Sequence, residues 1–236
     1  MTTSYPAAFE KYNAASKAAV KFTNKNWTKS AITRERIRLL SEARAALVAA
    51  VPAPAEDDAP DARATHEALA QLSPHNADTV AVTRNEWEKV KSLLDSGRNF
   101  AHLIDNADRN RLAAILDRLP TEIATQSDQP DDTIREVEGR VLARLAELGD
   151  EKASAAQAAT GAAQHDGAWR KVIEQATTGR VTVDTWSALH RSSPEEYRAA
   201  LNDDDPERSE VQVAIEHLDK IARSFAPEEA TSGPAA

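Results

Sequence analysis

Residues 133–149 read TIREVEGRVLARLAELG, and this stretch decides the fold class. Its large apolar side chains share one face of an α-helix, since they recur every three or four residues: Ile134, Val137, Val141, Leu145 and Leu148. Thr133 and Glu136 form a capping-box sequence at its start, and Gly149 is a typical helix terminator. The stretch predicts an amphipathic helix whose apolar face needs a partner surface.

Similar signals recur along the chain. A second capping-box sequence begins at Thr83 and a third at Ser193, where Pro194 would take the first helical position. The strongest late stripe comprises Val211, Ala214, Ile215, Leu218, Ile221, Ala222 and Phe225. With 41% hydrophobic residues, 5% aromatic residues and 7 glycines, helix formers dominate the 236-residue chain. We therefore expect an all-α fold, in which amphipathic helices form a helical body behind a basic, aromatic N-terminal helical arm.

Proline and acidic residues suggest where the chain divides. Residues 52–61 contain prolines and acids without an apolar period, which is typical of a linker. A second break lies near Pro130, and the last residues are small and polar. The predicted organisation is a basic, aromatic arm, an acidic Pro-rich linker, two helical groups and a disordered tail, at residues 1–51, 52–61, 62–126, 131–225 and 226–236.

Three local expectations accompany this division. The Ala-rich stretch Ala153–Ala163 is either a tight helix contact or a weakly anchored connector, and its small side chains favour the connector. Trp87 and Trp169 lie on apolar stripes and should be buried. Trp27 follows a polar Asn-Lys-Asn run and should be more exposed.

Charge and aromatic residues concentrate at the N-terminus. Residues 1–50 carry nine Lys and Arg against three Glu, although the whole chain has a formal net charge of −9. Such an asymmetry indicates an arm that meets a partner. On a helical projection Tyr5, Phe9, Tyr12 and Phe22 share one face, and the lysines share the other.

Three interpretations of this arm remain open. The aromatic face can pack on the body of the same chain, it can bind a protein partner or another copy, or the lysines can meet nucleic acid or an anionic membrane. The partner-binding hypothesis names seven candidate residues: Phe9, Tyr12, Lys17, Lys21, Phe22, Lys25 and Trp27.

Catalytic and cofactor sites are not predicted. The chain has no Cys, its six His show no HxH or HxxxH pair, and its glycines form neither GxGxxG nor a P-loop. Acidic clusters at Asp105 to Asp108, Asp131 to Asp132 and Asp203 to Asp205 lie at expected helix junctions, where Asp usually caps a helix. We therefore expect no enzyme activity, no cofactor and no metal site.

The composition leads to one functional prediction and one alternative. No apolar segment is long enough to span a membrane and no secretory signal is apparent, so a cytoplasmic location is expected, or a virion-associated one for a bacteriophage protein. The predicted function is a non-enzymatic structural or adaptor protein that acts through protein–protein contact, with a bacteriophage structural or assembly role and self-assembly as possibilities. The alternative is a DNA-associated accessory protein whose basic arm contacts phosphates.

Overall fold

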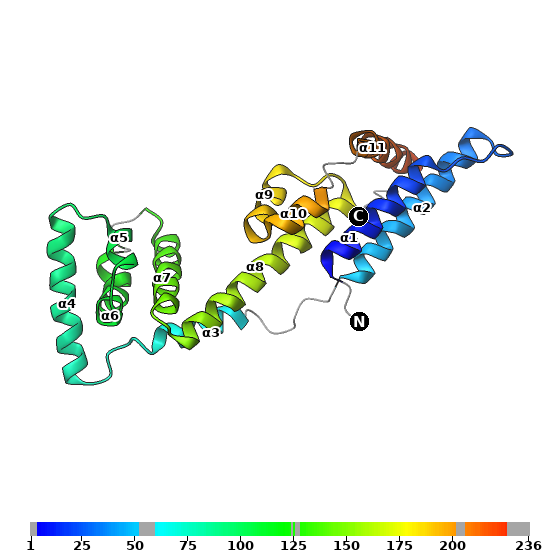
Figure 1. Cartoon of the computed structure of the whole chain (residues 1–236). Coiled ribbons are helices and arrows are strands. Elements are labelled where there is room, and N and C mark those ends of the chain that lie inside the picture. Colours follow the sequence, from blue (N-terminus) through cyan, green and yellow to red (C-terminus); the bar gives the residue numbers. More distant parts are fainter. Residues whose placement is uncertain (1–3, 52–59, 124, 126–127, 202–205, 226–236) are drawn as a thin grey trace, which may run out of the picture. The chain divides into compact units, whose positions relative to one another are not determined.

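A computed structural model describes residues 4–51, 60–123, 125, 128–201 and 206–225 (Figure 1). Every long regular element in these residues is a helix and none is a strand, which confirms the all-α prediction. The helices are α1 (Tyr5–Lys21), α2 (Lys29–Ala50), α3 (Pro60–Ala70), α4 (Ala77–Asp95), α5 (Phe100–Asp105), α6 (Arg109–Arg118), the π-helix η1 (Leu119–Ile123), α7 (Pro130–Glu147), α8 (Glu151–Thr178), α9 (Val183–Ser192), α10 (Pro194–Leu201) and α11 (Arg208–Phe225).

The chain divides into two compact units. Unit 1 comprises residues 1–54 and 164–236, and unit 2 comprises residues 55–163. This division differs from the one expected from the sequence, because α1 and α2 belong with the C-terminal helices instead of forming an arm of their own. The linker expected at 52–61 falls mostly outside the described residues, and α3 already begins at Pro60. The tail expected at 226–236 lies wholly outside them.

Unit 2 has an aliphatic core built from helices that are neighbours in sequence. Its buried side chains include five that are 0% exposed: Val90, Ile104, Leu112, Ile115 and Leu145. Trp87 is 5% exposed at the edge of this core, as the sequence predicted for it.

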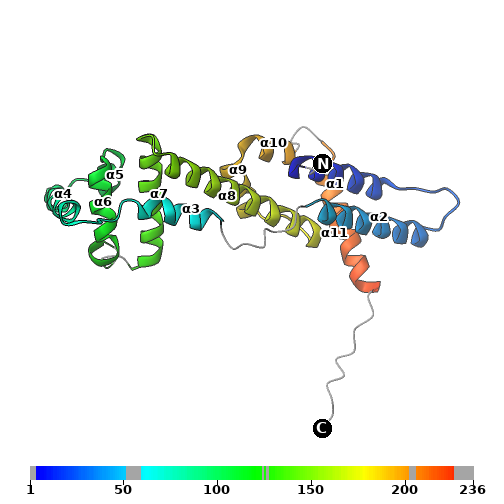
Figure 2. The same cartoon turned by 90° about the horizontal axis from the view of Figure 1, so that it is seen from below.

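Unit 1 brings together segments from the two ends of the chain. Figures 1 and 2 both show α1 and α2 side by side as an antiparallel hairpin, with their connecting turn at the end away from α9 and α10. Aromatic and aliphatic side chains of α1, α2, α8, α9 and α10 share one buried cluster. A second cluster joins α11 to the hairpin through Ala19, Leu40, Ile215 and Leu218.

Two of the three predicted helix starts are wrong. The helix α4 begins six residues before Thr83, because Asn76 and Thr79 form a capping box of their own, and Thr83 is buried in the helix interior. Likewise α7 begins at Pro130, and the Thr133 hydroxyl donates a hydrogen bond to the carbonyl of Gln129 within the first turn. The third start, at Pro194, is confirmed.

The Ala-rich stretch is helical, and the short segment before α9 is irregular. The Ala-rich residues belong to the continuous helix α8, and Ala153 and Ala156 are fully buried in the core of unit 2. The tight-contact interpretation therefore holds at its start, and the favoured connector does not, because small side chains let helices approach closely. Residues 181–182 lie outside any helix or strand, and Thr182 caps α9 by accepting from the Thr185 backbone.

Candidate interaction surface

The first predicted site residues lie inside the core of unit 1. Phe9 is 4% exposed, and its ring centroid lies 5.8 Å from that of Trp169 and 6.1 Å from that of Trp186. Tyr12 is also buried, and its hydroxyl donates to the carbonyl of Ala176 at 3.0 Å. The sequence left this packed arrangement open as one of three interpretations. A partner could reach Phe9 and Tyr12 only if α1 left its own core, so they are removed from the candidate surface.

A polar network fixes the beginning of α1 on α8. The Tyr5 hydroxyl donates to a carboxylate oxygen of Asp166, and Arg170 Nε donates to the other at 2.5 Å. Burial, and then the hydrogen bond to Asp166, raise the pKa of Tyr5 to about 12. The Tyr5 ring also stacks on Trp169 at 6.0 Å, with an interplanar angle of 7°. This network explains why the aromatic face of α1 stays on its own chain.

A second network in the same place involves α10. His165 Nε2 lies 2.5 Å from a carboxylate oxygen of Glu196, and Trp169 Nε1 donates to the same oxygen at 2.6 Å. The pair resembles the His–carboxylate part of a catalytic triad. Such a pair acts in catalysis only together with a nucleophile that is aimed at the substrate. No group of three His, Cys, Asp or Glu in the described residues could hold a metal ion. These contacts fasten α10 to α8.

The next two predicted residues pair with an acid of their own chain. Lys17 Nζ and Lys21 Nζ lie 2.7 and 2.6 Å from carboxylate oxygens of Glu207, just before α11. Hydrogen bonds from the two lysines lower the pKa of the Glu207 carboxyl, and the one from Lys17 contributes most. Both lysines therefore help to dock α11 on α1, which the lysine spacing alone did not reveal.

The last three predicted residues lie in the turn between α1 and α2. Trp27 is 44% exposed, as predicted, and its ring lies 5.8 Å from that of half-buried Phe22. Lys25 is exposed. We call residues 22–29 the hairpin tip.

Local hydrogen bonds hold the hairpin tip in shape. The Asn26 backbone donates to the Asn24 side chain at 2.9 Å, which closes a tight Asx-type turn. Thr28 then caps α2 by accepting from the Ala31 backbone at 3.2 Å. From the second turn of α2, Arg36 Nε donates to the carbonyl of Phe22 at 2.9 Å. The exposed indole of Trp27 is therefore presented on an ordered turn.

The charged residues that flank this indole in sequence are basic. Residues 21–34 contain Lys21, Lys25, Lys29 and Arg34 and no acidic residue. Of these, Lys25, Lys29 and Arg34 are exposed, and the Arg34 guanidinium lies 6.0 Å from the ring centroid of Phe225. Lys29 and Arg34 were counted in the charge balance of the sequence but not among the candidate residues; Lys29 lies in the hairpin tip and Arg34 lies further along α2.

Comparisons with known proteins add nothing to this surface: no family model, no curated protein and no solved structure matches the chain. Among the described residues, no helix combines the length and the apolar character that a membrane crossing requires. The candidate site therefore rests on the geometry of the hairpin tip alone.

Proposed function

We propose that the chain is a non-enzymatic adaptor or structural protein that binds an acidic segment of another protein through the hairpin tip. The observation that carries the proposal is the environment of Trp27, which is 44% exposed on an ordered turn while Phe9 and Tyr12 of α1 are buried. Exposed Trp and Arg side chains are the types that most often dominate the energy of an interface. The neighbouring cations favour an acidic partner and speed its association.

Selection from a random peptide library against the full chain would test this proposal. Peptides enriched by the wild-type chain should be rich in Asp and Glu and should be lost on Trp27→Ser, because the indole supplies most of the contact. The matched control is Val80→Ser, which changes an exposed apolar side chain of unit 2 that is 53% exposed. Enrichment without acidic residues, or equal binding by Trp27→Ser, would contradict the proposal.

The basic tip also supports the second candidate, a DNA-associated accessory protein. Two of the N-terminal lysines are engaged by Glu207, which leaves three exposed cations near the tip, at Lys25, Lys29 and Arg34. Three phosphate contacts would make the affinity fall about 40-fold between 50 and 200 mM salt. Fluorescence anisotropy with a labelled 20-base-pair duplex would detect such a fall, and Gln at all three positions should then abolish binding. Acidic-peptide binding through Trp27 should be far less sensitive to salt.

A further inference from the structure

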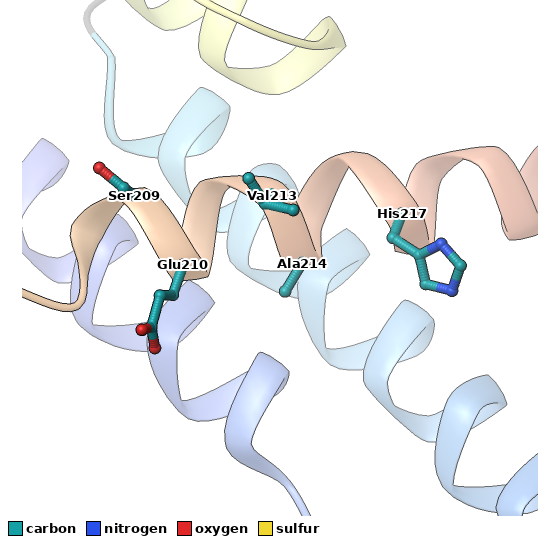
Figure 3. Close-up of a pocket in the computed structure, with 5 residues that line it drawn as sticks. All are labelled: Ser209, Glu210, Val213, Ala214 and His217. Carbon is teal, nitrogen blue, oxygen red and sulfur yellow. The ribbon is translucent and has the colours of Figure 1, made fainter.

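The outward face of α11 forms an open, mostly apolar depression in unit 1. Ser209, Glu210, Val213, Ala214 and His217 line it, with a volume of about 520 Å³. Figure 3 shows that all five side chains come from this one helix. Val213 is 66% exposed, although α11 is the most strongly amphipathic helix by its sequence pattern. The helix thus has a valine where solvent would favour a polar residue.

The opposite face of α11 is firmly attached to the hairpin. Ile215 and Leu218 are each 5% exposed and pack against the side chains of α1 and α2. Arg44 donates two hydrogen bonds to the Asp219 carboxylate, at 2.7 and 2.8 Å, and both side chains are largely buried. A two-bond guanidinium–carboxylate contact fixes orientation as well as distance. The helix cannot turn to hide Val213 without breaking these contacts.

Five of the exposed residues of α11 follow the spacing of a helix-pairing stripe, while Ser209, Arg223 and Phe225 are exposed outside it. The five recur at alternating intervals of three and four residues, as in a two-helix seam: Glu210, Val213, His217, Lys220 and Ser224. The stripe has an acid on one side of its centre and a base on the other. Two copies of α11 laid antiparallel and centred on position 215 would place Glu210 of each copy opposite Lys220 of the other. Val213 of each copy would then pack on His217 of the other.

We propose that this face of α11 is an isologous interface with a second copy of the chain. An antiparallel pair satisfies both charges at once, whereas a parallel pair would set Glu210 against Glu210 and Lys220 against Lys220. An isologous contact of this type closes into a dimer and does not continue into a filament. The 18-residue helix is about 27 Å long, so it covers less than the roughly 800 Å² per partner of a standard interface. The dimer is therefore weak and forms at high protein concentration.

Cysteine crosslinking tests the antiparallel arrangement directly, because the chain has no cysteine of its own. One variant carries Glu210→Cys and a second, with a size tag, carries Lys220→Cys. A mixture of the two should form a disulfide-linked pair of tagged and untagged chains under mild oxidation. Neither variant alone should do so, because equivalent positions lie about 15 Å apart along the helix axis in this arrangement. Crosslinking of each variant alone as fast as of the mixture would overturn the proposal.

Charge exchange tests the register without cysteine. Glu210→Lys and Lys220→Glu should each weaken dimerisation by about three- to tenfold in sedimentation equilibrium. The double variant should restore it, because the opposite charges meet again with their signs exchanged. Absence of rescue would overturn the proposal.

A single substitution at the centre provides the loss-of-binding test and its control. Val213→Asp should leave the chain monomeric at the highest concentration studied, while Val80→Asp, at an exposed valine of unit 2, should dimerise normally. Circular dichroism should show unchanged helix content in both. Trp27→Ser should also dimerise normally, so this inference and the proposed function of the hairpin tip can fail separately. Dimerisation by Val213→Asp at wild-type strength would overturn the inference.

Discussion

Units 1 and 2 are both helical, but they are built in different ways. Unit 2 uses one continuous segment and an aliphatic core in which Trp87 is the only buried aromatic residue of the described part. Unit 1 joins the two ends of the chain through stacked rings, led by Phe9 and Trp169, and through long-range polar contacts such as Arg44 with Asp219. Helices that are neighbours in sequence can pack after closing only a short loop. The helices of unit 1 pack only when a loop of more than a hundred residues is closed.

Removing residues 1–54 should have the largest effect on stability, and it should distinguish unit 1 from unit 2. The deletion takes away α1 and α2, so Trp169, Val172 and Leu189 would lose the side chains that cover them. We expect unit 1 to lose its cooperative melting transition while unit 2 keeps its own, measured by calorimetry.

Residues 55–163 alone should melt cooperatively and serve as the matched control. Retention of both transitions in the deletion variant would show that α1 and α2 are a dispensable arm, as the sequence first indicated.

Phe9→Ala should strongly destabilise unit 1. Loss of a fully buried Phe typically costs about 3–5 kcal/mol, from lost transfer free energy and the cavity left behind. Phe22→Ala is the matched control, because the same side chain is only half-buried at the hairpin tip. Urea denaturation followed by circular dichroism would measure both free energies of unfolding. Equal losses would contradict the burial difference between them.

Helix caps allow a comparison within unit 2. Asn76→Ala and Asp108→Ala should each lower the free energy of unfolding by about 1 kcal/mol, because each side chain accepts a hydrogen bond at a helix start. Thr133→Ala should cost less, since Thr133 lies inside the first turn of α7, where its hydroxyl donates to the carbonyl of Gln129. Chemical denaturation measures all three. A larger loss at Thr133 would restore the helix start predicted from the sequence.

Alkaline pH should weaken unit 1 selectively through Tyr5. Its pKa is about 12 in the folded chain and 10.0 ordinarily, so folding favours the protonated phenol. The resulting stability is fully present below pH 10, falls as the pH rises from 10 to 12, and is absent above. Tyr5→Phe should lower stability at neutral pH by about 1 kcal/mol and should reduce this alkaline slope. Unit 2 alone, which lacks Tyr5, is the control, and an unchanged slope in Tyr5→Phe would contradict the assignment.

The difference between the units also explains what the sequence could predict. Periodic stripes such as Val137, Val141 and Leu145 identify helices because the pattern is local, and they also predicted the burial of Trp87 and Trp169. Helix starts were predicted less accurately, because Thr83 has a capping sequence but Asn76, further upstream, caps the same helix. The partner of Phe9 could not be predicted, because nothing in residues 1–50 reveals that Trp169 and Trp186 will lie beside it. For the same reason Lys17 and Lys21 appeared available to a partner until Glu207 was placed next to them.

Trp27→Ser should have the smallest effect on stability, and this makes it the most informative test of the hairpin tip. The indole contacts Phe22 but remains 44% exposed, so its loss should lower the free energy of unfolding by less than about 1 kcal/mol. Trp169→Ser, at a residue with 0% exposure in the centre of unit 1, should unfold that unit. Iodide should quench Trp27 strongly and Trp169 hardly at all in variants that keep one tryptophan and carry Phe at the other three positions. A binding side chain is expected to show this signature: its loss changes stability little but abolishes peptide binding. If Trp27→Ser instead destabilised unit 1 as much as Phe9→Ala, the indole would belong to the core and the hairpin tip would lose its central contact.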